Sequence, residues 1–194
     1  MLPDMIDFIA RFALFAAVHS FLAAETAKEW LRSRIGMAMR GYRLGYNLVS
    51  ILLFGWVMAA WRQSPVIYAL PRLLALPLYA VEACLLIILA VCASQTGIGD
   101  FLGFRQLLGR SGREGLVTTG CYGRVRHPQY TLAIAFLLFT PIMTAKWLVL
   151  TLLSVPYLVF GALLEEKRLG GEFGTAYRRY RERVPMFIPR FRRQ

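Results

Sequence analysis

Two clusters of polar side chains, residues 126–130 and 165–167, lie at the two ends of one long apolar run in this 194-residue chain. The first reads Arg-His-Pro-Gln-Tyr and the second Glu-Glu-Lys. Charged side chains are costly beside hydrocarbon unless they face a protein interior or a polar cavity. If the apolar run folds back as a helical hairpin, both clusters lie at the same end. We therefore expect them to line one pocket, in which the paired carboxylates hold a cationic ligand such as an ammonium or a sulfonium.

Further stretches have residues that suit such a pocket. The loop 115–122 reads Gly-Leu-Val-Thr-Thr-Gly-Cys-Tyr, and its glycines let the backbone approach a ligand closely. Tyr177 and Tyr180, at helical spacing, are either packing residues or aromatic walls for an adenine or a sulfonium. In the N-terminal half, His19 is either a buried histidine bonded to a backbone carbonyl or a general base for a thiol or amine acceptor. Glu82, inside an apolar run, is either a paired buried acid or a pocket residue.

The composition indicates that membrane helices must position these residues. The chain is 57% hydrophobic, whereas soluble domains are roughly 45–50% apolar. Its net charge of +12 would also fit nucleic acid, but the basic residues lie mostly between apolar runs and in the tail. That pattern favours anionic lipid headgroups, and no nucleic-acid-binding motif is present. We therefore expect membrane lipids, and no nucleic acid, as partners.

The apolar runs predict an all-α integral membrane helix bundle of about five transmembrane helices. Residues 5–24, 44–61 and 73–94 are each close to the ~20 residues that a bilayer core requires. The run 131–164 is too long for one ordinary span, and Pro141 and the Lys-Trp pair at 146–147 divide it into two. We expect a single membrane domain over residues 1–194. Its N-terminal part, 1–96, has three helices, and 97–194 has the cofactor-binding loop, the helical hairpin and a C-terminal cytosolic segment.

The distribution of basic residues predicts the orientation in the membrane. The segments 25–43 and 95–127 and the tail from Lys167 are rich in Arg and Lys, whereas the opposite side has only Arg62, Arg72 and Lys146. Because basic loops stay on the cytoplasmic side, we expect the N-terminus outside and the C-terminus and the pocket in the cytoplasm. For a bacterial protein this membrane is the inner membrane. A cleaved signal peptide is not expected, because the first run begins with Asp4 and Asp7.

The cysteines and histidines are too few and too scattered for a metal cluster. The chain has three cysteines and two histidines, and no Cys-x-x-Cys pair occurs. We therefore expect no metal site. Cys84 and Cys92 are expected to be free thiols in the third apolar run, and Cys121 a reduced thiol facing the cytosol.

Taken together and in order, these motifs resemble the isoprenylcysteine carboxyl methyltransferase family over residues 105–190. The shared features are the Gly-Leu-Val-Thr-Thr-Gly-Cys-Tyr loop, Arg-His-Pro-Gln-Tyr, a helical hairpin, Glu-Glu, Gly-x-x-Tyr-x-x-Tyr and a Val-Pro…Ile-Pro ending. The N-terminal half looks instead like the NnrU and methanethiol S-methyltransferase branch of that superfamily. There a His-Ser pair, here at 19–20, precedes a basic loop and a Tyr-Arg-Leu-x-Tyr-Asn stretch, here at 42–47.

The resemblance implies a methyltransferase that binds S-adenosylmethionine in a cytosolic pocket and methylates a lipophilic or small apolar acceptor. The residues matching cofactor contacts are Leu116, Val117, Tyr122, His127, Pro128, Tyr130 and Glu165, with Tyr180 as a wall. No catalytic residue is assigned; the candidates are His19, Arg126 and Glu166. The candidates for the substrate pocket are His19, Asn47, Glu82 and Gly161.

One departure bears on the acceptor. The carboxyl methyltransferases have an arginine four residues before the first glutamate of the pair, where it binds the substrate carboxylate. This chain has Gly161 at that position. The acceptor is therefore either a thiol or an isoprenylcysteine-like carboxylate held by another arginine. Two other classes stay open, a non-catalytic lipid-binding or assembly protein and a reductase with the same C-terminal architecture, although such reductases are much longer.

Overall fold

The computed structural model describes the chain except for residues 36–40, 98, 100–101, 109–114 and 191–194. The described part is mostly helical and divides into two units. The first unit comprises residues 1–65 and 98–114, and the second comprises residues 66–97 and 115–194. The third apolar run groups with the C-terminal residues by these contacts.

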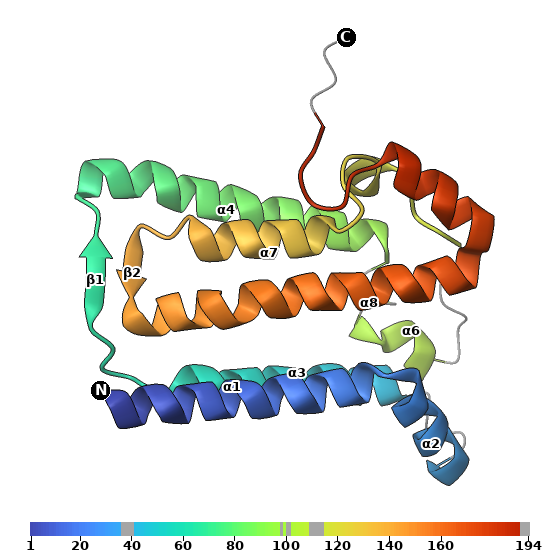
Figure 1. The fold of residues 1–194 in the computed structure, drawn as a ribbon, viewed down its shortest axis with the longest axis horizontal. Helices are drawn as coiled ribbons and strands as arrows, with labels where there is room; N and C mark the ends of the chain where they lie inside the picture. The colour runs from blue at the N-terminus through green and yellow to red at the C-terminus, as the bar shows by residue number, and fades with distance from the viewer. Residues whose placement is uncertain (36–40, 98, 100–101, 109–114, 191–194) are drawn as a thin grey trace. The chain divides into compact units, whose positions relative to one another are not determined.

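The first unit is built on two long helices that lie side by side (Figure 1), α1 (Leu2–Ala23) and α3 (Tyr42–Ala59). The shorter α2 (Glu25–Ile35) and α6 (Phe104–Leu107) complete it. Two charged residues in the apolar part of α1 neutralise each other, because Arg11 pairs with Asp7 at 2.8 Å. The Arg11 guanidinium also lies 4.6 Å from the ring centre of Trp56 on α3. This pairing explains how an otherwise apolar helix contains both charges.

The second unit contains α4 (Arg72–Gln95), the 3₁₀ turn η2 (Gly120–Gly123), α7 (Pro128–Leu138) and α8 (Ala145–Arg183). Helix α7 packs against both α4 and α8 (Figure 1). Two short antiparallel strands, β1 (Val66–Ala69) and β2 (Ile142–Thr144), pair beside the N-terminal ends of α4 and α8. The all-α prediction was therefore wrong in one detail, because part of the expected turn at 141–146 forms a strand whose partner precedes α4.

Side chains of α8 satisfy the backbone at the connection between α7 and α8. The indole N–H of Trp147 donates to the carbonyl oxygen of Leu137 at 3.0 Å, and the Thr151 hydroxyl reaches the same oxygen at 3.4 Å. These bonds replace the helical partner that this carbonyl loses where α7 ends. The Thr144 hydroxyl oxygen accepts from the Trp147 N–H at 3.1 Å and so caps the start of α8.

Replacing Thr144 with alanine is expected to lower the stability of the protein by about 1 kcal/mol, the usual contribution of such a cap. In a chain of this size the loss corresponds to a fall in Tm of about 2–4 °C in detergent. Thr119→Ala is the matched control, because exposed Thr119 precedes η2 without making a side-chain cap bond. Equal Tm values for the two variants would contradict the capping role of Thr144.

Three helices of the described part, α1, α4 and α8, are long and apolar enough to cross a membrane. Helix α7, with 11 residues, measures about 16 Å, against the roughly 30 Å of a bilayer core. The 18-residue α3 is not among the three. The chain is therefore a membrane protein, and the count of five transmembrane helices stays a prediction. The apolar stretch of α8 ends at Leu164, and the helix changes direction at Gly174, which has a φ of 52°.

Candidate active site

Glu166 is the centre of the polar cluster in the second unit. Its side chain is 8% exposed. Its Oε1 atom accepts from Arg126 Nε at 2.6 Å and from the Tyr177 hydroxyl at 2.8 Å, and it lies 3.0 Å from His127 Nε2. Its Oε2 atom accepts a second bond from Arg126 at 3.1 Å. The structure thus brings the Arg-His cluster before α7 together with the glutamates of α8.

The pair of Arg126 and Glu166 is tightly held. A remaining guanidinium N–H of Arg126 donates to the carbonyl oxygen of Val184 at 2.6 Å. Burial would raise the pKa of the Glu166 carboxyl, but the hydrogen bonds from Arg126, Tyr177 and His127 outweigh it and hold the pKa below its usual range. Burial and the adjacent Glu166 raise the pKa of Tyr177, so the phenol keeps the proton that it donates. Arg126 and Glu166, the two candidates for catalysis in the cluster, therefore hold each other and their neighbours in place.

The C-terminal segment 184–187 lies along the start of α7. The N–H groups of Arg126 and His127 donate to the carbonyl oxygens of Pro185 at 2.9 Å and Met186 at 3.1 Å. The Phe187 ring lies 5.9 Å from the His127 ring, centre to centre. Sequence reasoning recognised only that the Val-Pro…Ile-Pro stretch closes the domain, and it missed Phe187 as a neighbour of the site. An aromatic residue between the two prolines was the available signal.

Glu165 is the more accessible of the two glutamates, with 35% of its side chain exposed. One of its oxygens lies 3.6 Å from His127 Nδ1, so His127 lies between both carboxylates. Burial would raise the pKa of Glu165, but the neighbouring His127, Arg168 and Tyr130 outweigh that effect and lower it. The result is an ionised carboxylate that is partly open, on the polar side of the point where the apolar stretch of α8 ends.

The other predicted contacts lie around this pair. Pro128 begins α7 and is buried. The Tyr130 ring is 5.6 Å from the His127 ring, and a Cβ placed on Gly161 would lie 4.0 Å from the Tyr130 hydroxyl. The loop residues Leu116, Val117 and Tyr122 are half-buried.

Tyr177 and Tyr180 belong to a small apolar core. They are 1% and 4% exposed, and Val184, Leu116, Leu169 and Phe173 pack with them. The Tyr180 hydroxyl donates to the carbonyl oxygen of Tyr122 at 2.6 Å. The sequence left two interpretations of these tyrosines, packing residues or aromatic walls for a ligand. Their surroundings are those of packing residues. Tyr180 acts on the loop 115–122 through the backbone of Tyr122.

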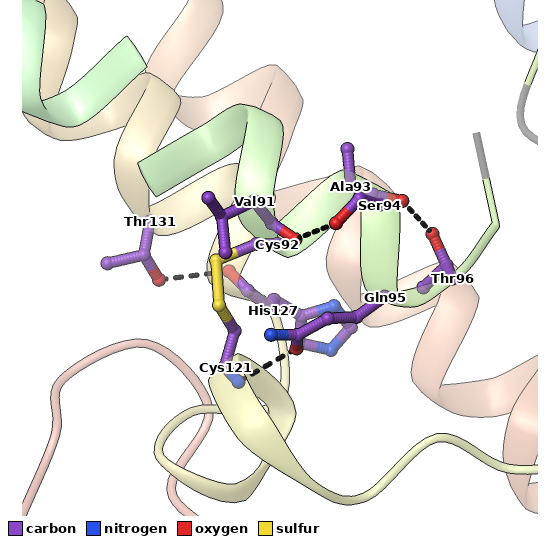
Figure 2. Close-up of a disulfide and its surroundings, with 9 residues drawn as sticks. All are labelled: Val91, Cys92, Ala93, Ser94, Gln95, Thr96, Cys121, His127 and Thr131. Atoms are coloured by element: carbon purple, nitrogen blue, oxygen red, sulfur yellow. Dashed lines mark hydrogen bonds between the residues drawn. A yellow bond between two sulfur atoms is a disulfide. The ribbon is translucent and has the colours of Figure 1, made fainter. Parts of the chain in front are cut away.

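A disulfide joins Cys92 on α4 to Cys121 on η2 (Figure 2), with Cα atoms 5.6 Å apart. The prediction of free thiols at these two positions was wrong. The last turn of α4 packs against η2, and this long-range contact brings together cysteines 29 residues apart. Cys84 is a free thiol, and it is exposed on α4.

The remaining candidates lie elsewhere. In the first unit, His19 Nδ1 is 2.9 Å from the Ser50 hydroxyl oxygen and Nε2 is 2.8 Å from the Tyr46 hydroxyl, so each ring nitrogen has a side-chain neighbour. Asn47 donates to the carbonyl oxygen of Leu102 at 3.1 Å. Glu82 lies partly exposed on α4 of the second unit. Among the described residues, no group of three or more His, Cys, Asp or Glu has the arrangement of a metal site.

Comparison with known proteins gives a consistent result over nearly the whole chain. A family model described as NnrU protein matches residues 7–182. Methanethiol S-methyltransferase 2 of Bradyrhizobium diazoefficiens is 32% identical over 191 residues, which cover 92% of this chain and 70% of the relative. Methanethiol S-methyltransferase of Pseudomonas deceptionensis is 29% identical over 188 residues, covering 93% and 71%. No solved structure matches the chain.

Proposed function

Because this chain is a methyltransferase of the NnrU family, we propose that its methyl donor is S-adenosylmethionine and its acceptor is a small thiol. The names of the two relatives support the thiol. The observation that carries the donor is Glu165, a partly open carboxylate held ionised beside His127. An ionised acid in that position suits the ammonium group of an amino-acid moiety.

The residues around Glu165 fit such a donor. His127, directly before α7, and Tyr130, on α7, orient the carboxylate. The half-buried apolar side chains of Leu116 and Val117 offer surface to an adenine ring. In its bound state the donor would supply an electrophilic methyl group on a sulfonium. The protein's own tasks are then to align the acceptor with that methyl carbon and to exclude water.

The chemistry asks little of side chains beyond alignment. A thiolate attacks the methyl carbon directly, and the bond between that carbon and the sulfonium sulfur breaks. A thiol with an ordinary pKa must first lose its proton, for which His19 stays our candidate base. Asn47 and Glu82 stay candidates for the acceptor pocket.

The connection within the second unit supports the proposed five-helix count. Strand β1 leads into α4, and β2 pairs with β1, whereas α7 begins beside the far end of α4, where Cys92 binds Cys121. The chain must therefore return along α4 between residues 128 and 144. Helix α7 covers about 16 Å of this path, and the six residues that follow add about 20 Å if extended. The sum exceeds the roughly 30 Å of a bilayer core.

We also propose that the polar cluster faces the cytoplasm and that the N-terminus lies outside, in a bacterial inner membrane. The support is the excess of Arg and Lys in α2, in the loop before α7 and in the tail. Further basic residues, in 36–40, 109–114 and 191–194, lie outside the described part of the chain.

A binding titration separates this function from its rivals. Purified protein in detergent is titrated with S-adenosylmethionine, S-adenosylhomocysteine and NADPH. We expect saturable binding of the first two and none of NADPH. Binding of NADPH alone would favour a reductase, and binding of none of the three would favour a non-catalytic protein.

The surroundings of Gly161 support a thiol as the acceptor. One turn before Glu165, Gly161 has no side chain, and among the described residues the Tyr130 hydroxyl is what a Cβ at that position would meet, at 4.0 Å. A buried carboxylate would need a cation there, and Arg126 is already bonded to Glu166 and Val184. We expect turnover of methanethiol to exceed turnover of a prenylcysteine by at least about tenfold, one factor of ten for each ~1.4 kcal/mol of unmet interaction.

The same turnover assay is also run on the variant Gly161→Arg. Its side chain would push against Tyr130, so we expect methanethiol turnover to fall. Gly171→Arg is the matched control, because the space around Gly171 on the same helix is open. Robust turnover of prenylcysteine by the unaltered protein, lost when Arg168 is neutralised, would contradict the proposed acceptor and show that another arginine holds the carboxylate.

A further inference from the structure

The last turn of α4 holds η2 by two contacts, one covalent and one not (Figure 2). Cys92 and Gln95 are three residues apart and therefore share one face of the helix. Cys92 forms the disulfide, and the Gln95 side-chain oxygen accepts from the Cys121 N–H at 2.9 Å. The fit is close, because a Cβ on Gly120, which has a φ of +63°, would lie 2.5 Å from the same oxygen.

Backbone bonds connect the disulfide to the candidate active site. The carbonyl oxygen of Cys121 accepts from the N–H groups of Arg124 at 3.1 Å and Val125 at 3.3 Å. Val125 is buried and directly precedes Arg126 and His127. On the other side, Tyr122 follows Cys121 and is held by Tyr180 of α8. A change at the disulfide therefore acts on the segment that joins the predicted cofactor loop to His127.

The two cysteine residues differ in their exposure to solvent. Cys92 is 1% exposed, whereas Cys121 is half-buried on a turn at the surface of the unit. A small thiolate can attack the sulfur of Cys121, whereupon the bond to Cys92 breaks and Cys92 leaves as a thiolate that takes up a proton. A second thiol releases the mixed disulfide, so that two small thiols become one small disulfide and the protein gains two thiols.

We propose that the Cys92–Cys121 disulfide is a thiol–disulfide exchange site for small thiols, and that its state sets the affinity of the adjacent loop for the methyl donor. The proposal rests on the proposed function, because donor binding is its readout and a small thiol is the acceptor. In the proposed orientation the bond faces the cytoplasm, where thiols are kept reduced. The pair then passes between two states instead of serving as a permanent crosslink.

The test compares full-length protein in detergent before and after treatment with dithiothreitol. Alkylation and intact mass count the free thiols, which we expect to be one, Cys84, before treatment and three after it. Calorimetry then measures the Kd for S-adenosylmethionine. We expect a rise of roughly three- to tenfold on reduction, as the fraction of protein with a binding-competent loop falls.

Two variants make the comparison specific. The double variant Cys92→Ser, Cys121→Ser should bind the donor as weakly as the reduced protein and should not respond to dithiothreitol. Cys84→Ser is the matched control and should respond as the unaltered protein does. Hydrogen exchange of the amides 120–125 gives a readout that needs no ligand, and it should be faster after reduction.

Each other outcome has a definite meaning. Three free thiols before treatment, or a bond that dithiothreitol does not open under native conditions, would overturn the exchange site. Equal Kd values in both states would overturn the coupling and leave the proposed function intact. An absence of donor binding in both states, with hydrogen exchange of the loop unchanged, would overturn both the proposed function and the coupling. Faster hydrogen exchange after reduction, without donor binding in either state, would reject the methyl donor and the coupling and keep only the thiol–disulfide exchange site.

Discussion

Replacing Glu166 with glutamine is expected to destabilise the second unit by about 3 kcal/mol or more, the usual result of removing one partner from a buried ion pair. The glutamine keeps the shape of the side chain and one acceptor oxygen, but it leaves the Arg126 guanidinium, which is 10% exposed, without its counter-charge. The expected readout is a fall in Tm in detergent, at about 2–4 °C for each kcal/mol in a protein of this size.

The same variant should change how stability depends on pH. The pKa of Glu166 lies below its usual value in the folded protein, against about 4.3 for an unfolded glutamate. A depressed pKa contributes stability that is present above the unfolded pKa and is lost as the pH falls through the folded pKa. Between pH 7 and pH 3 the unaltered protein should therefore lose more stability than Glu166→Gln, and the two Tm curves should converge at low pH.

Tyr180→Phe provides the control for this measurement. Tyr180 is as buried as Glu166 and on the same helix, but its hydroxyl donates to a neutral backbone carbonyl. Loss of that bond is expected to cost about 1 kcal/mol, with no change in pH dependence. If Glu166→Gln costs no more than Tyr180→Phe, the ion pair does not have the structural role that its geometry indicates.

The sequence was sufficient to predict the apolar helices and the meeting of the two polar clusters. Helices α1 and α4 lie within three residues of the predicted spans, because hydropathy alone determines where a long apolar helix begins and ends. Arg126 and Glu166 meet because a hairpin must return to its own starting end. The local hydropathy pattern is enough to predict the helices, and the return of the hairpin is enough to predict that the two polar clusters meet.

The features that the sequence did not predict are contacts between distant segments. The hydropathy of residues 131–141 is the same whether the helix ends at Leu138 or continues. Pro141 has no N–H to bond to the carbonyl oxygen of Leu137, and the side chains of Trp147 and Thr151 on α8 bond to that oxygen instead. Likewise, Cys92 forms a disulfide and Cys84 does not because η2 packs against the last turn of α4, where Cys92 lies. No local periodicity contains that information.

The tertiary surroundings also give Glu165 and Glu166 different roles. Adjacent acids on one helix point about 100° apart, so one faces the interior and the other does not. Glu166 faces Arg126 and Tyr177, and Glu165 faces the partly open side near Tyr130. Sequence reasoning selected both residues, and only the neighbours of each assign them different tasks.

Glu165→Gln is therefore expected to weaken the binding of S-adenosylmethionine while leaving the fold intact. The change removes a charge-assisted contact to the ammonium of the donor, at a cost of about 1.5–3 kcal/mol, which is a rise in Kd of roughly 10- to 100-fold. The Tm should change little, because Glu165 is one-third exposed and the glutamine keeps its shape. Calorimetry on full-length protein in detergent measures the Kd.

Glu172→Gln is the matched control for charge, because Glu172 is an exposed acid farther along α8. It should leave the Kd and the Tm unchanged. A normal Kd in Glu165→Gln would remove Glu165 from the donor site. A large loss of Tm in that variant would place Glu165 in the same structural role as Glu166. The proposed division of tasks requires opposite results for these adjacent residues. Glu165→Gln must weaken donor binding without lowering the Tm, and Glu166→Gln must lower the Tm.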